Sequence, residues 1–171
     1  MLIKNVHIEN QETATDIRIV DGIITEISDH LHAGDNEEVI DATGKLALPP
    51  FIEPHIHLDS VLTAGEPKWN ESGTLFEGIE TWALRKESLT YDDVKERAGR
   101  AIRKQAANGI QFVRTHVDTT DPNLTALRAL IDLREEVKDF IEIQIVAFPQ
   151  EGILSFKNGF ELLEEALKLG A

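Results

Sequence analysis

The sequence has no cysteine, one methionine, one tyrosine and few aromatic residues overall, at 6%. The absence of cysteine excludes disulfides, cysteine-type zinc sites and a thiol nucleophile. No apolar run approaches the roughly 20 residues that a membrane-spanning helix needs. The polar N-terminus, MLIKNVHIEN, does not resemble a secretory signal. We therefore expect a soluble, cytoplasmic protein.

Positive charge is also scarce. The chain has 17 lysine and arginine residues against 31 aspartate and glutamate residues, a formal net charge of -14, and no basic cluster. Because attraction to phosphate groups dominates nucleic-acid affinity, this balance argues against nucleic acid and anionic membranes as partners. It favours a small neutral or cationic substrate. The 171 residues, 42% of them hydrophobic, are enough for one domain with a substantial core.

The first 48 residues indicate a small β-rich unit. Residues 2–8 alternate imperfectly between apolar and polar side chains, and a short strand is expected at residues 38–41. Residues 16–20 and 23–27 predict a hairpin, because the intervening Asp21-Gly22 supplies the positive φ angles of a tight turn. These strands are too few to be stable alone, so we expect the unit to pack against further structure.

From residue 49 onward, strand and helix patterns alternate. Thr90 has Asp93 three residues later, as at a helix start, and Gly109 ends that helix. Asp121 followed by Pro122 predicts the start of another helix. This alternation is typical of the βα repeat of a parallel sheet. We expect strands near residues 51–57, 110–117 and 141–148, and helices near residues 74–85, 90–108, 121–137 and 160–169.

Two histidines, His55 and His57, lie in the stretch Pro-His-Ile-His-Leu-Asp. Alternate side chains of a strand share a face, so both imidazoles point the same way and can reach one metal ion. Ordinary hydrogen bonding at a strand end is the alternative, and the pair alone does not decide between the two. A catalytic site also needs about three protein ligands and an open position.

Further polar residues follow the next two predicted strands. His116 and Asp118 come at the end of one, and Gln150 follows the other. Chemistry in open α/β sheets and barrels takes place at the carboxyl ends of the strands. His116 taken alone fits a hydrogen-bonded core histidine equally well. Arg114, within a strand, is predicted to be a buried and paired charge.

Five strings carry a resemblance that spans essentially the whole chain. They are EPHIHLD at residues 53–59, LTAGEP at 62–67, WNESGTLFEGI at 69–79, RTHVD at 114–118 and QIVAFPQEG at 144–152. Together they resemble the amidohydrolase superfamily and, within it, the bacterial cytosine deaminases. The third and the last of these strings are strong signals, whereas the histidine pair alone is a weak one.

The resemblance implies a fold and an activity. The fold is α/β, in which residues 1–48 form part of a β-sandwich and residues 49–171 form the first three βα units of a (β/α)8 barrel. The implied activity is hydrolytic deamination of cytosine to uracil and ammonia, as in pyrimidine salvage. The enzyme would act on a small heterocycle, and we expect it to be a homo-oligomer when complete.

The resemblance also implies roles for single residues. His55 and His57 would bind one divalent metal, iron or zinc. Gln150 would hydrogen-bond the pyrimidine, and Leu75 would line the base pocket. His116 and Asp118 would lie just behind these groups and support them.

The chain is shorter than the roughly 250 residues that a complete barrel needs. We therefore expect the remaining metal ligands and the acid/base residues beyond Ala171, and predict no catalytic residue within this chain, which alone would be inactive. Two alternatives stay open. One is a related amidohydrolase acting on isoguanine or a triazine, and the other is a non-catalytic half-barrel subunit that needs a partner chain.

Overall fold

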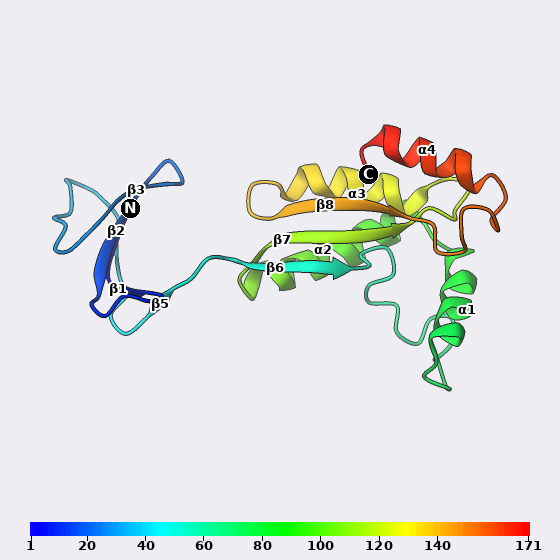
Figure 1. The fold of residues 1–171 in the computed structure, drawn as a ribbon, viewed down its shortest axis with the longest axis horizontal. Helices are drawn as coiled ribbons and strands as arrows, with labels where there is room; N and C mark the ends of the chain where they lie inside the picture. The colour runs from blue at the N-terminus through cyan, green and yellow to red at the C-terminus, as the bar shows by residue number, and fades with distance from the viewer. The chain divides into compact units, whose positions relative to one another are not determined.

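The computed structural model describes all residues from 1 to 171 and divides them into two compact units, residues 1–49 and residues 50–171 (Figure 1). The N-terminal unit consists of short strands. They are β1 (Leu2–Ile8), β2 (Thr15–Val20), β3 (Ile23–Ser28), β4 (Val39–Asp41) and β5 (Leu46–Ala47).

The strands of the N-terminal unit form one sheet in the order β3-β2-β1-β4, and β5 also pairs with β1. The predicted hairpin is confirmed: β2 and β3 are antiparallel, and Val20 pairs with Ile23. Its turn residues, Asp21 and Gly22, have φ angles of 52° and 77°. These positive values match the right-handed twist of the flanking strands.

The core of this unit is small. Val6, Ile17 and Ala42 are its buried members. By contrast, large apolar side chains of β3 and β4 are exposed, including Ile23, which is 66% exposed. The sequence-based expectation that this unit belongs to a β-sandwich stays a prediction.

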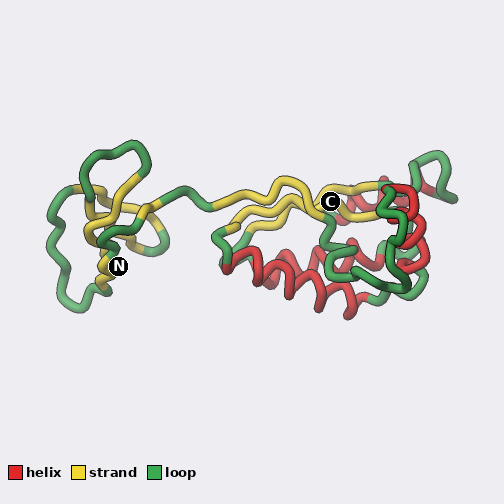
Figure 2. Tube along the Cα trace, turned by 90° about the horizontal axis from the view of Figure 1, so that it is seen from below, coloured by secondary structure: helices red, strands yellow, loops and turns green.

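The C-terminal unit is a three-stranded parallel sheet in the order β6-β7-β8 with helices between the strands (Figures 1 and 2). This confirms the predicted βα repeat. Helices α2 and α3 pack against one face of the sheet (Figure 2). The strands are β6 (Phe51–Ile56), β7 (Ile110–Asp118) and β8 (Glu142–Phe148), and the helices are α1 (Leu75–Lys86), α2 (Tyr91–Ala107), α3 (Thr125–Val137) and α4 (Gly159–Leu169).

The main core lies between the sheet and these helices. Alternate residues of β7 and β8, such as Val117 and Ile143, are buried against side chains such as Ile102 and Leu130. The intervening residues face the other side, as the period of two in a strand requires. None of the helices is both long and apolar enough to cross a bilayer.

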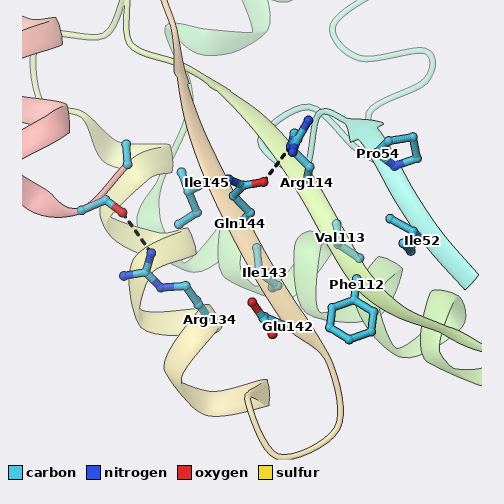
Figure 3. Close-up of a pocket in the computed structure, with 12 residues that line it drawn as sticks. Ile52, Pro54, Phe112, Val113, Arg114, Arg134, Glu142, Ile143, Gln144 and Ile145 are labelled. Carbon is cyan, nitrogen blue, oxygen red and sulfur yellow. Dashed lines mark hydrogen bonds between the residues drawn. The ribbon is translucent and has the colours of Figure 1, made fainter. Parts of the chain in front are cut away.

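A hollow of about 610 Å³ is lined by residues of β6, β7 and β8, and also by Arg134 of α3 and by Gly170 and Ala171 (Figure 3). Arg114 lies there and donates a hydrogen bond from Nε to Oε1 of Gln144 on the neighbouring strand, at 2.7 Å. Arg114 is exposed, so the prediction of a buried charge was wrong. Its strand position places it on the face that no helix of this chain covers. The hollow is also lined by Phe112 and Glu142.

The helix starts agree with the sequence in one case and differ in another. The Thr90 side chain caps α2 and accepts a hydrogen bond from the Asp93 amide, as predicted. The helix expected from Asp121 begins instead at Thr125. The Asp121 carboxylate accepts hydrogen bonds from the amides of Asn123 and Thr125, at 3.0 and 2.7 Å, which holds residues 121–124 in a turn.

Candidate active site

Three imidazoles meet at the carboxyl ends of β6 and β7. His55 lies in β6, His57 is the first residue after that strand, and His116 lies near the end of β7. The His55 and His116 rings are stacked with centroids 4.1 Å apart. The His57 centroid lies 5.5 Å from that of His55 and 5.8 Å from that of His116. The pairing of two parallel strands thus brings together residues about 60 positions apart in the sequence.

The surroundings keep two of these rings neutral. Burial lowers the pKa of His57, and the neighbouring His55 and His116 lower it further. Burial also lowers the pKa of His116, together with His55 and Arg114. A neutral imidazole has the free lone pair that a metal ion requires.

The histidines have some of the features of metal ligands. Nδ1 of His116 is buried and has no hydrogen-bond partner, although buried polar atoms in proteins are nearly always paired. Neutral rings with a free nitrogen suit a divalent transition metal. No group of three His, Asp or Glu side chains in the chain is arranged to hold a metal ion. The histidines therefore fit part of a metal site.

Asp59 links the two strands beneath the histidines. It is 1% exposed, and its Oδ2 accepts a hydrogen bond of 2.8 Å from the amide of Asp118 at the end of β7. Its Oδ1 accepts another from the amide of Ser60 and lies 3.9 Å from Nδ1 of His57. Burial raises the pKa of Asp59 to about 6. Sequence analysis did not single out this residue, although it belongs to the histidine motif.

Asp118 joins β7 to α1 and to the loop after β8. Its Oδ2 accepts hydrogen bonds from Trp82 Nε1 at 3.1 Å and from Lys86 Nζ at 2.8 Å. Its Oδ1 accepts hydrogen bonds from the amides of Thr120 and Gln150, at 2.7 and 3.4 Å. Burial alone would raise the pKa of Asp118, but the bonds from Lys86 and Thr120 outweigh it, and the pKa is lowered. The carboxylate is therefore charged.

A cavity of about 220 Å³ lies beside these groups, and His55 and His116 are not among the residues that line it. The cavity brings together four residues selected from the sequence, namely His57, Leu75, Asp118 and Gln150. Leu75 is the first residue of α1 and is 75% exposed. The roles assigned to these residues stay predictions. The lining is completed by Asp59, Ser60, Gly78, Ile79 and Trp82.

Sequence analysis missed Trp82 and Lys86 as site residues. Both lie on α1, four residues apart, and therefore on one face of that helix. That spacing was the signal available in the sequence. It did not reveal that both side chains bond to the same carboxylate oxygen of Asp118.

Residues 38–169 match the amidohydrolase family. The chain belongs to this family. The crystal structure of 5-methylcytosine deaminase from Klebsiella pneumoniae liganded with 5-fluorocytosine is 51% identical, with a TM-score of 0.93, and the match covers 100% of this chain and 42% of that one. These matches confirm the resemblance stated from the sequence and the assignment of the sheet to an amidohydrolase barrel.

Two other relatives are named for a different compound, N-isopropylammelide. N-isopropylammelide isopropylaminohydrolase from Burkholderia multivorans ATCC 17616 is 32% identical, with a TM-score of 0.82 over 99% of this chain and 43% of that one. N-isopropylammelide isopropyl amidohydrolase from Pseudomonas sp. (strain ADP) is 31% identical over 99% of this chain and 43% of its own length. The chain thus spans about two fifths of the relatives that it matches. Amidohydrolases generally use a divalent metal and act on carbon–nitrogen bonds.

Proposed function

We propose that this chain supplies part of the active site of a metal-dependent aminohydrolase that converts cytosine, or a closely related aminopyrimidine, and water into the corresponding uracil and ammonia. The observation that carries the proposal is the cavity in which His57 lies together with Leu75 and Gln150. The 51% identity to a deaminase solved with 5-fluorocytosine supports the choice of ring.

His55 and His57 are the proposed ligands of one divalent ion, iron or zinc, because imidazole suits both metals. When bound, such an ion lowers the pKa of water and makes hydroxide available near neutral pH. The low pKa of His57 keeps its ring free to bind the ion at neutral pH. In this proposal the other ligands and the acid/base residues come from outside the 171 residues, which are inactive alone.

Gln150 is proposed to form hydrogen bonds with the polar edge of the substrate ring. A side-chain amide donates and accepts hydrogen bonds at once, so it can pair with a ring edge that presents an acceptor beside a donor. Leu75 and Trp82 offer apolar surface to the faces of a flat ring. His116 and Asp118 support these groups from the end of β7.

A second candidate is an aminohydrolase acting on an N-alkylated triazine. It is favoured by the 31% and 32% identities to the two N-isopropylammelide enzymes. Ring choice depends on which groups face the ring, and the present chain supplies only one wall of the pocket in this proposal. The two candidates share the metal site and differ in substrate.

The test is turnover by the complete native protein, purified with its metal. We expect ammonia from cytosine or 5-methylcytosine, and little isopropylamine from N-isopropylammelide. The reverse preference would establish the second candidate. His57→Ala should abolish turnover and lower the metal content, whereas His7→Ala, a change of the same kind at an exposed position of the N-terminal unit, should alter neither. Unchanged turnover in His57→Ala would refute the site.

A further inference from the structure

Lys86, the last residue of α1, sits among three oxygen atoms. Its Nζ lies 2.8 Å from Oδ2 of Asp118, 2.8 Å from Oγ1 of Thr120 and 2.7 Å from Oε1 of Glu151. Only 10% of its side chain is exposed. An ammonium group has three N–H donors, and each has a partner here. A long and flexible side chain is thus held in one position.

The charges around Lys86 favour this arrangement. Burial works to lower the pKa of Lys86, but hydrogen bonds to Asp118 and Glu151 outweigh it, and the pKa is raised. One cation therefore neutralises two carboxylates that come from different elements. Without it, Asp118 and Glu151 would face each other as like charges in a partly buried place.

Both partners of Lys86 are tied to the walls of the cavity. Glu151 follows Gln150 directly in the chain, and Asp118 accepts a hydrogen bond of 3.4 Å from the backbone N–H of Gln150. Asp118 also accepts the hydrogen bond from the Trp82 indole. Lys86 itself is not among the residues that line the cavity. It therefore acts on the cavity only through the residues that it holds.

We propose that Lys86 is a positioning residue for substrate recognition: by holding Asp118 and Glu151 together, it fixes the backbone at Gln150, from which the side-chain amide extends, and the Trp82 indole at the cavity. This inference rests on the proposed function, in which Gln150 binds the ring. It adds a determinant of specificity on α1 that makes no contact with the substrate.

The expected kinetic effect follows from the role of Gln150. A contact to the ring edge is made both in the bound substrate and in the transition state, so its loss weakens binding uniformly. Uniform weakening raises KM and leaves kcat nearly unchanged. For Lys86→Met we expect KM to rise by up to about tenfold, the scale of one hydrogen bond between neutral groups, with kcat within about threefold of wild type.

The experiment compares four variants of the complete native protein. Lys86→Met removes the charge but keeps the length, Lys86→Gln keeps a polar group in case the first variant does not fold, and Lys86→Arg should restore most of the affinity. Lys95→Met is the matched control, because Lys95 pairs with Glu136 on the outer surface of the helices. An unchanged KM in both Lys86→Met and Lys86→Gln would overturn the proposal. So would a fall in kcat alone, or an arginine variant as impaired as the methionine variant.

A second measurement separates this inference from the proposed function. The indole N–H resonance of Trp82, assigned by its loss in Trp82→Phe, reports the bond to Asp118 without any substrate. We expect it to move in Lys86→Met and to stay in place in Lys95→Met. If cytosine is not deaminated but the resonance moves, the function is wrong and the positioning role stands for another substrate. A resonance that does not move overturns the positioning role whatever the activity.

Discussion

Arg97 of α2 offers a direct test of how the loop after the histidine pair is held. Its Nη1 donates hydrogen bonds to the backbone carbonyls of Asp59 and Val61, at 3.0 and 2.7 Å. Its Nε and Nη2 donate to the two carboxylate oxygens of Asp93, at 3.1 and 2.8 Å. The residue is 6% exposed. One guanidinium therefore fastens the backbone beside His57 to α2.

Arg97→Met should lower the free energy of unfolding by about 3 kcal/mol. The buried carbonyl of Asp59 and the partly buried carbonyl of Val61 lose their donor, and an unpaired buried group costs roughly 1–3 kcal/mol. The Asp93 carboxylate keeps a hydrogen-bond donor in this variant, because Arg85 also donates to both of its oxygens, at 2.9 Å each. The methionine side chain keeps much of the apolar contact of the arginine stem. The change in unfolding free energy is measured by urea denaturation.

Arg100→Met is the matched control, because Arg100 lies on the same helix but is exposed. Its unfolding free energy should stay within about 0.5 kcal/mol of wild type. The metal content of Arg97→Met should also fall, since the backbone that follows His57 loses its anchor. A loss of stability below about 1 kcal/mol in Arg97→Met, or an equal loss in both variants, would refute the reasoning.

Two further predictions concern pH and packing. The pKa of Asp59 is raised to about 6 in the folded chain against an ordinary value of 3.8, so the folded carboxyl holds its proton more tightly than the unfolded one. The contribution of Asp59 to the free energy of unfolding therefore rises as the pH falls from about 7 to about 4, by up to about 3 kcal/mol. In the metal-free protein, Asp59→Asn should flatten the plot of unfolding free energy against pH over that range. Leu130 in α3 is 0% exposed, so Leu130→Ala should cost about 2–5 kcal/mol in denaturant unfolding, whereas Leu167→Ala at an exposed position of α4 should cost under about 1 kcal/mol. An unfolding free energy of the wild type that does not change over this pH range would contradict the first expectation. An equal loss of unfolding free energy in the two leucine variants would contradict the second.

Local patterns in the sequence predicted most of the secondary structure. The Asp21-Gly22 turn and the Thr90 cap were identified because their signals lie within four residues of the structure that they specify. The start of α3 was misplaced because the Asp121 carboxylate bonds the amide of Asn123 in a turn as well as that of Thr125, so the helix begins at Thr125 instead of directly after Asp121. Which amides the Asp121 carboxylate bonds depends on the conformation of the neighbouring backbone, which the residue pattern does not specify.

The candidate site was predicted in part. His55 and His57 share a strand face by local rules, and the parallel sheet brings His116 to them. The contacts of Lys86 were not predictable, because its partners Asp118 and Glu151 lie 32 and 65 residues away. A single sequence carries no periodicity that reports such distant pairs.

The pair formed by Arg114 and Gln144 on the uncovered face of the sheet restricts what can cover that face (Figure 3). The guanidinium of Arg114 carries five N–H donors, and within this chain its side chain makes one hydrogen bond, from Nε to Gln144. A purely apolar covering would leave the remaining donors without water or another acceptor, and would leave a buried charge without a partner, at a cost of roughly 3–5 kcal/mol. Whatever segment or layer of water lies against these strands must therefore bring oxygen acceptors to Arg114. Arg114 and Gln144 therefore require a polar neighbour at this point of the sheet.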